Sequence, residues 1–271
     1  MNFLDFLAPL TSDEFKTKVF DKRSIAVTRD SNPYPDLLTL SEIELRLNDG
    51  SATLASLAVV GKDGAKLPRD IIYNNREELR WSPIAMKKRF VLDKVTNHHS
   101  FVMHNMTQIN RNMSDIADSI EDEFPGFHTD LHIYISPRPS STGYNVHRDS
   151  PQHKIFIQLI GKTHWTIYKR SNESMALPMA MPLSDAEKVL EVDFRSVLTP
   201  GSAIYMPPDT YHHVVNGDGP RVSLSFPFTY DPTKVRMDRT HIPFKRIFES
   251  SDDIDQAAEN DTQPISAQGN A

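Results

Sequence analysis

The feature that most constrains the fold is a change of hydrophobic period near residue 130. Beyond this point apolar and polar residues alternate, as is typical of strands with one buried face. Seven segments show this pattern: Leu131–Ser136, Lys154–Ile160, Thr163–Tyr168, Val192–Leu198, Ala203–Met206, Tyr211–Val215 and Arg221–Phe228. So many short strands without a long helix between them predict an antiparallel sandwich or barrel.

Before residue 130 the pattern is helical or mixed. Apolar residues three or four apart predict a helix over about 106–123, which ends at Pro125-Gly126. Thr11 and Glu14 have the spacing of a helix-capping box, and Ser41 and Glu44 repeat it. Two short strands are expected before that helix, at 25–27 and 52–60.

These patterns divide the chain into four parts. Residues 1–125 form a helical and mixed part that packs on the core, 126–230 the β-rich core and 231–248 a C-terminal helical segment. Residues 249–271 contain six acids, no Lys or Arg and few large apolar side chains, which predicts a disordered acidic tail. The charged, proline-interrupted stretch 61–95 is expected to cover the substrate.

Composition excludes several classes of function. The chain has no Cys, so any metal must be held by His, Asp or Glu rather than by thiolates. Its 36 acids against 30 bases argue against a nucleic-acid partner. The first ten residues lack the basic start of a signal peptide, and the longest apolar stretch, 52–60, is too short for a bilayer. We therefore expect a cytoplasmic protein without a membrane partner.

One short motif offers metal ligands. In His147-Arg148-Asp149 the imidazole and the carboxylate are two residues apart, so on a strand both face the same side. Two His and one carboxylate form the facial triad of non-heme Fe(II) oxygenases. The third ligand must come from elsewhere, and His212-His213 lies in a later strand. The second His-x-Asp copy, at His128, follows a Pro-Gly turn and is interpreted as an ordinary ion pair.

The surroundings of the motif resemble the JmjC/cupin-type Fe(II)- and 2-oxoglutarate-dependent oxygenases, in their ribosomal-oxygenase-like and asparaginyl-hydroxylase-like branches. The resemblance covers about 130–228 and depends on these residues: Tyr134-Ile135-Ser136-Pro137, Gly143, His147, Asp149, Phe156, Gln158, Gly161, Trp165, Pro200-Gly201, Tyr205 and Pro207-Pro208. It implies a mainly β fold with flanking helices around a double-stranded β-helix, the cupin-like jelly roll.

The resemblance also implies the chemistry. His147 and Asp149 become metal ligands, and the family spacing after Pro207 selects His212 over His213. The cofactors would be Fe(II), 2-oxoglutarate as cosubstrate and O2, and succinate and CO2 would be the coproducts. The reaction would hydroxylate an unactivated C–H, on a peptidyl, carrier-bound or free amino-acid side chain. No catalytic residue beyond the metal ligands is implied.

The sequence departs from the family where 2-oxoglutarate binds. The family usually has a basic residue two positions after the turn glycine, but in this chain the position two after Gly161 holds Thr163. The adjacent Lys162 falls on the opposite face of the strand. The alternative anchor for the far carboxylate is Arg221, because a guanidinium binds carboxylates in bidentate fashion. Uncharged side chains expected to assist in binding this carboxylate are Ser223, Ser225, Thr163 and Tyr134. His132 occupies the position where the family usually has Asn.

The remaining candidates receive structural interpretations. Phe156 and Trp165 are expected in the core and Arg148 is expected to point away from the metal. Four further histidines are expected to be solvated: His98, His99, His104 and His241. A metal-binding cupin module without turnover is the alternative function. The ribosomal oxygenases carry further domains after the core, whereas about forty residues follow Tyr230 here, which weakens the transfer of their ribosomal-protein substrate to this chain. The partner is expected to be a small molecule or a peptide, and a homodimer stays open.

Overall fold

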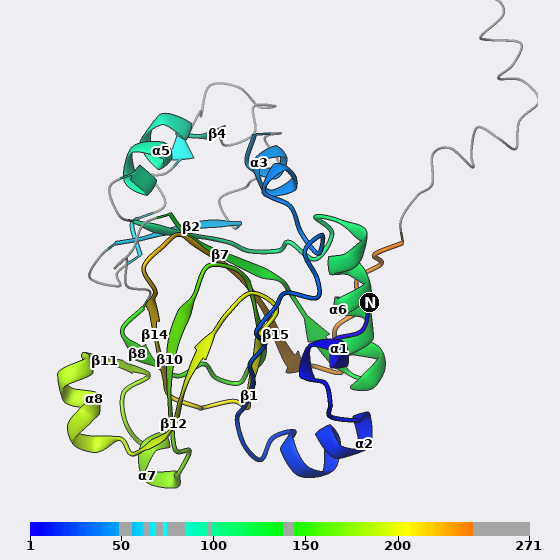
Figure 1. The fold of residues 1–271 in the computed structure, drawn as a ribbon, viewed down its shortest axis with the longest axis vertical. Coiled ribbons are helices and arrows are strands. Elements are labelled where there is room, and N and C mark those ends of the chain that lie inside the picture. The colour runs from blue at the N-terminus through cyan, green and yellow to red at the C-terminus, as the bar shows by residue number, and fades with distance from the viewer. Residues whose placement is uncertain are drawn as a thin grey trace, which may run out of the picture. The chain divides into compact units, whose positions relative to one another are not determined.

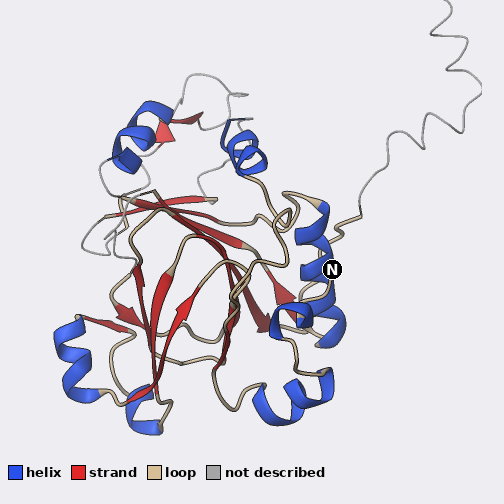
Figure 2. Ribbon diagram, in the orientation of Figure 1, coloured by secondary structure: helices blue, strands red, loops and turns tan. Residues whose placement is uncertain are grey.

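Two antiparallel sheets dominate the computed structural model, which describes residues 1–48, 56–61, 66–68, 73–74, 85–96, 99–137 and 144–240 (Figures 1 and 2). The larger sheet has the order β1 (Ile25–Val27), β13 (Ala203–Met206), β9 (His153–Ile160), β15 (Arg221–Tyr230), β7 (His132–Ser136), β5 (Ser100–Met103) and β2 (Leu57–Val60), and β6 (Phe127–Thr129) also pairs with β15. The smaller sheet has the order β11 (Ala180–Met181), β8 (Val146–His147), β14 (His212–Asn216), β10 (Thr163–Tyr168) and β12 (Val192–Leu198). A separate pair joins β3 (Tyr73–Asn74) and β4 (Ala85–Met86).

Helices lie outside the sheets (Figure 1). Their bounds are α1 (Leu4–Leu7), α2 (Ser12–Glu14), the π-helical turn η1 (Phe15–Val19), α3 (Leu40–Asn48), α5 (Lys88–Thr96), α6 (Arg111–Glu123), α7 (Asn172–Met175) and α8 (Leu183–Val189). Apolar residues of α1, η1 and α6 pack on the outer face of the larger sheet, and Ala186 of α8 packs beside the smaller one. Among the described residues, no helix has the length and apolar character of a membrane span.

Strand alternation separates an outer core from an inner one. On β9, Ile155 and Ile157 join the outer cluster under the N-terminal helices, whereas Phe156 points between the sheets. There it meets Trp165 of β10, with ring centroids 4.8 Å apart. On β15, Phe226 belongs to the outer cluster and is fully buried. The inner faces of β9 and β15 are therefore available to line a site.

The alternation predicted the strands of the core well. The segments 163–168, 192–198 and 203–206 are confirmed to the residue, and the other four agree within a few residues. The two-residue strands β8 and β11 were missed, because two residues show no periodicity. The expected strand over 52–60 is observed as β2, and its residues 52–55 lie outside the described residues.

The start of α3 was predicted too late in the sequence and the start of α6 too early. The capping box at Thr11 is confirmed, but the second box belongs to Thr39 and Glu42 rather than Ser41 and Glu44. The helix expected from 106 begins at Arg111, because the side chain of Asn110 accepts a hydrogen bond from Met113 N at 3.0 Å and caps the helix there.

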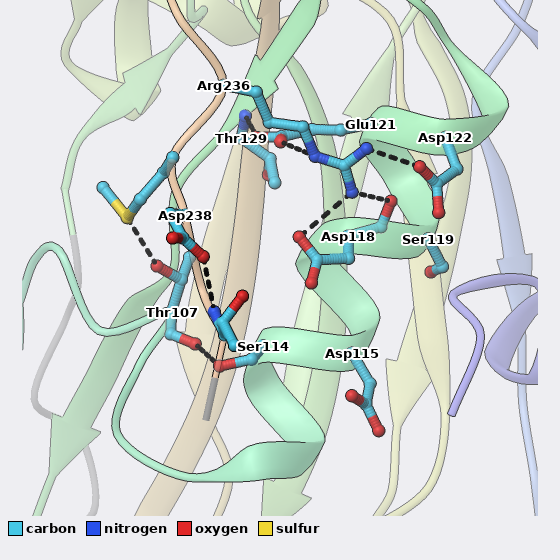
Figure 3. A network of polar contacts seen from close by, with 12 residues as sticks. Thr107, Ser114, Asp115, Asp118, Ser119, Glu121, Asp122, Thr129, Arg236 and Asp238 are labelled. Atoms are coloured by element: carbon cyan, nitrogen blue, oxygen red, sulfur yellow. Dashed lines mark hydrogen bonds and ion pairs between the residues drawn. The ribbon is translucent and has the colours of Figure 1, made fainter. Parts of the chain in front are cut away.

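After β15 the chain is held against α6 (Figure 3). The Arg236 guanidinium contacts three carboxylates of that helix: Asp118 at 3.1 Å, Glu121 at 3.2 Å and Asp122 at 2.5 Å. Residues 231–240 form turn and coil rather than the helix expected over 231–248, since the Asp231 side chain accepts from Thr233 N and turns the chain. Residues 241–248 and the tail 249–271 lie outside the described residues, as do Gly143 and much of 61–95.

Candidate metal centre and adjoining cavities

The three predicted metal ligands meet at one end of the smaller sheet. His147 ends β8 and His212 begins β14, and the two residues face each other in the antiparallel register. Asp149 follows β8, with its Oδ2 atom 3.8 Å from His147 Nε2 and 3.7 Å from His212 Nε2. The three potential ligand atoms lie within 4.8 Å of one another, which suits a single ion.

Backbone carbonyls orient both imidazoles. The carbonyl of Asn145 lies 2.7 Å from His147 Nδ1, and that of Thr210 lies 3.0 Å from His212 Nδ1. A carbonyl can only accept, so each Nδ1 carries the proton and each Nε2 keeps its lone pair. Those lone pairs belong to the atoms nearest Asp149, which is the arrangement that metal-binding histidines need.

The protonation states also suit a metal. Burial lowers the pKa of His212 to about 3 and lowers that of His147, so both rings are neutral near pH 7. Burial alone would raise the pKa of Asp149, but the Lys154 ammonium, together with the attraction of the two imidazoles in their protonated form, lowers it to about 2. Metal binding therefore needs no proton to leave these groups at neutral pH.

A loop holds the ligand segment in place. Asp209, in the left-handed conformation with φ of 61°, donates its backbone N–H to Asp149 O at 2.9 Å. Its carboxylate binds Arg148, whose guanidinium also lies 5.8 Å from the ring of Tyr211. Arg148 is thus turned to the loop, and its role there is structural.

Lys154 is the charged residue that the sequence analysis overlooked. Its ammonium lies 2.6 Å from Asp149 Oδ2, and the side chain is 6% exposed. Lys154 and Phe156 are two residues apart on β9, so their side chains point to the same face of the strand. This spacing from an inward-facing aromatic residue could have indicated from the sequence that Lys154 faces the site.

A small inner pocket of about 30 Å³ adjoins the triad. Its walls are formed by side chains from both sheets: Tyr134, Tyr144, His147, Lys154, Phe156, Trp165, His212, Val214, Arg221 and Ser223. Phe156 and Trp165 are buried as predicted, but they also line this pocket, so their interpretation as core alone was incomplete.

Arg221 lies in this pocket without an acidic partner. It is 5% exposed, and its Nε donates to Ser136 Oγ at 3.2 Å. No carboxylate among the described residues pairs with its guanidinium. Burial lowers its pKa to about 10, which still leaves it charged at neutral pH. A buried and uncompensated cation is costly unless an anion joins it, so the pocket is suited to an anionic group.

The other expected helpers divide into two groups. Tyr134 and Ser223 line the inner pocket with Arg221. Thr163 and Ser225 are buried but do not line it. The Thr163 hydroxyl donates to Gln158 Oε1 at 2.9 Å and accepts from Trp165 Nε1 at 2.9 Å, so it is already satisfied. Lys162 is exposed, as strand parity predicted, and does not line the pocket.

A larger outer cavity of about 430 Å³ shares Tyr134, Tyr144, His147 and Lys154 with the inner pocket. Two further histidines line it, His104 and His132, with ring centroids 4.3 Å apart. His104, which was expected to be solvated, is half-buried in the wall of this cavity. Tyr144, also overlooked, lies 5.4 Å from the His147 ring.

Residues 101–235 match the JmjC domain family, and no curated protein sequence matches the chain. The fold is similar to that of E. coli ycfD, with a TM-score of 0.54 at 16% identity over 97% of this chain and 62% of that one. The ribosomal oxygenase YcfD from Escherichia coli in complex with cobalt and 2-oxoglutarate gives a TM-score of 0.55 at 15% identity, over 97% and 61%. Its complex with cobalt and succinic acid gives 0.54 at 15%, over 97% and 62%.

These matches confirm the expected fold, a mainly β structure with flanking helices around a double-stranded β-helix of the cupin type. The chain spans about three fifths of the length of these solved relatives. At this level of identity the likeness concerns the fold.

Proposed function

Residues 101–235 are a JmjC domain, and on that premise we propose that the chain is an Fe(II)- and 2-oxoglutarate-dependent oxygenase. It hydroxylates an unactivated C–H of an amino-acid side chain, peptidyl, carrier-bound or free, and releases succinate and CO2. One observation carries the proposal: the neutral imidazoles of His147 and His212, with the Asp149 carboxylate beside them, line the same pocket as the buried Arg221 guanidinium, which has no carboxylate partner among the described residues.

The residues present fit the cofactors. His147, Asp149 and His212 would hold Fe(II), because their donor atoms converge and both imidazoles are fixed with Nε2 unprotonated. Arg221 would bind the far carboxylate of 2-oxoglutarate, with Ser223 and Tyr134 beside it. The fit supports a facial triad that leaves the remaining metal positions to cosubstrate and O2.

The bound iron and 2-oxoglutarate supply the oxidising power for C–H cleavage. The chain contributes binding and orientation. Phe156, Trp165 and Val214 give the inner pocket an apolar wall, which excludes water beside the ligands. Gln158 accepts from Ser223 Oγ at 2.9 Å and thereby fixes a hydroxyl next to the Arg221 side chain.

The test is spectroscopic and needs no substrate. Anaerobic Fe(II) and 2-oxoglutarate should give a visible charge-transfer band, and admitting O2 should release succinate. His147→Ala, Asp149→Ala and His212→Ala should each remove both signals. His213→Ala is the matched control and should keep them, because that ring follows His212 on β14 without lining the pocket.

Two results would contradict the proposal. Wild-type protein without the band and without succinate would exclude this chemistry. Tight metal binding without succinate release would favour the alternative, a metal-binding cupin module without turnover. The contact between Lys154 and Asp149 is the observation that supports this second candidate.

A further inference from the structure

Lys154 is a buried cation whose present partner is a proposed metal ligand. Its ammonium lies 2.6 Å from Asp149 Oδ2, and no second carboxylate among the described residues contacts it. An ion bound by Asp149 would share or take that oxygen, because the same atom faces both imidazoles. Lys154 would then be a buried ammonium whose carboxylate partner is engaged by the ion.

The outer cavity adds a second cation. Lys66 lines its wall, 5.6 Å from the ring of Tyr144, and has no acidic partner among the described residues. Arg148 also lines the cavity but is neutralised by Asp209. Asp149 is the one carboxylate among the described lining residues. The wall that faces an incoming substrate therefore has an excess of positive charge.

If the proposed function holds, the charges of the metal, the cosubstrate and the residues that bind them cancel. Fe(II), the Asp149 carboxylate, the two carboxylates of 2-oxoglutarate and the Arg221 guanidinium together carry no net charge. The ammonium groups of Lys154 and Lys66 are left over, one at the metal end and one on the wall of the same cavity. Complementary charge gives specificity to a binding site, so both favour an anion.

We propose that the substrate carries a carboxylate, which Lys154 and Lys66 bind in the outer cavity. Lys154 changes partner in this scheme: it contacts Asp149 before the metal enters and the substrate carboxylate afterwards. The substrate class is thus an acidic amino-acid side chain or a comparable small acid, rather than a basic or apolar side chain.

The test uses three matched probes, the N-acetyl N-methylamides of aspartate, asparagine and arginine. Each is added to protein loaded with Co(II) and 2-oxoglutarate, and the paramagnetic relaxation of its side-chain protons is measured against a Zn(II) reference. We expect the aspartate probe to bind about tenfold to hundredfold more tightly than its isosteric asparagine probe, as for a charge-assisted hydrogen bond. The arginine probe should bind most weakly.

Three variants assign the preference. Lys154→Met should remove most of it and should also tighten Co(II) binding, since a cation beside Asp149 is lost. Lys66→Met should reduce the preference by a smaller, salt-dependent factor of about twofold to fivefold, because Lys66 is exposed. Lys162→Met is the control and should leave both measurements unchanged, since this lysine lies outside the cavity.

The outcomes are separable. Equal binding of the three probes, or tightest binding of the arginine probe, would overturn the proposal. So would a Lys154→Met protein that binds 2-oxoglutarate weakly but keeps the probe preference, because the ammonium would then serve the cosubstrate. If the protein takes up neither Co(II) nor 2-oxoglutarate, the proposed function fails. Titrating the metal-free protein then still decides the charge preference, through Lys66.

Discussion

The strands β9 and β15 have two faces on a common backbone. The outer face presents Ile155, Ile157 and Phe226 to a dry core under the N-terminal helices. The inner face presents Lys154 and Arg221 to the two cavities. All five side chains are buried, but the outer ones pack against other apolar groups, whereas Lys154 contacts the proposed metal ligand Asp149 and Arg221 has no carboxylate partner among the described residues.

On this pair of strands the outer face therefore serves the stability of the fold and the inner face serves the proposed site. Burial of apolar groups stabilises the fold, whereas buried charges reduce stability and persist where a site requires them. Substitutions on the outer face should therefore unfold the protein and leave the chemistry of its folded fraction intact. Substitutions on the inner face should do the reverse.

The largest expected effect is on the outer face. Phe226→Ala should lower the free energy of unfolding by about 3–5 kcal/mol, because a fully buried ring leaves a cavity between sheet and helices. Urea unfolding measures this loss. The fraction that stays folded should bind Co(II) as the wild type does; weakened metal binding per folded molecule would show that the two faces are not independent.

The matching change on the inner face is Arg221→Met. It should weaken 2-oxoglutarate binding by about a hundredfold, since a bidentate charged contact is lost. The free energy of unfolding should be unchanged or raised, because a buried cation is removed. Calorimetric titration of the Co(II)-loaded protein tests the first point and urea unfolding the second. Undiminished affinity would move the anchor to another residue.

A pH effect tests the outer face at His153. The ring is buried against Phe20 and Phe228, and its Nδ1 lies 2.9 Å from Tyr205 OH, with Asp21 and Arg170 nearby. Burial lowers its pKa to about 4, below the ordinary value near 6.5. The unfolded chain thus binds more protons between these values, so stability rises with pH through this window.

Lowering the pH from 7 to 5 should accordingly cost about 2 kcal/mol through this group. His153→Phe keeps the ring stacking and removes the titration. Unfolding free energies of both proteins at the two pH values give the difference. An identical pH dependence in wild type and variant would mean that His153 does not carry the effect.

The smallest expected effect is at Lys162. Lys162→Ala should change the free energy of unfolding by less than about 0.5 kcal/mol, because the side chain is exposed. The affinity for 2-oxoglutarate should also be unchanged. A clear loss of that affinity would restore Lys162 as anchor and contradict the assignment to Arg221.

The strands were predictable because their alternation records burial on each face. Thr163–Tyr168, Val192–Leu198 and Ala203–Met206 were placed to the residue. Helix starts were less accurate, since Asn110 and Thr39 competed with other cap-forming residues nearby and only tertiary contacts decide between them. The strands β8 and β11 depend on pairing with distant partners, which no local pattern records.

The proposed ligands were named from spacing and resemblance, and the structure brings His147, Asp149 and His212 together. Lys154 was not named, because a lysine at a strand start is usually at the surface and its burial follows from the loop that carries Asp149. Thr163 was named for its position, but its hydroxyl already donates to Gln158, a contact between strands of the two different sheets that sequence alone does not reveal.

The direct opposition of His147 and His212 across β8 and β14 has a dynamic consequence. A two-residue strand that pairs with β14 at one register position, and otherwise only with the equally short β11 among the described strands, should fray long before the molecule unfolds. An ion bound to both imidazoles would cross-link the two strands, because binding to the closed form opposes opening. The amide protons of Val146 and His147 would then exchange with solvent slowly in the loaded protein and quickly in the empty one, which makes β8 a reporter of occupancy.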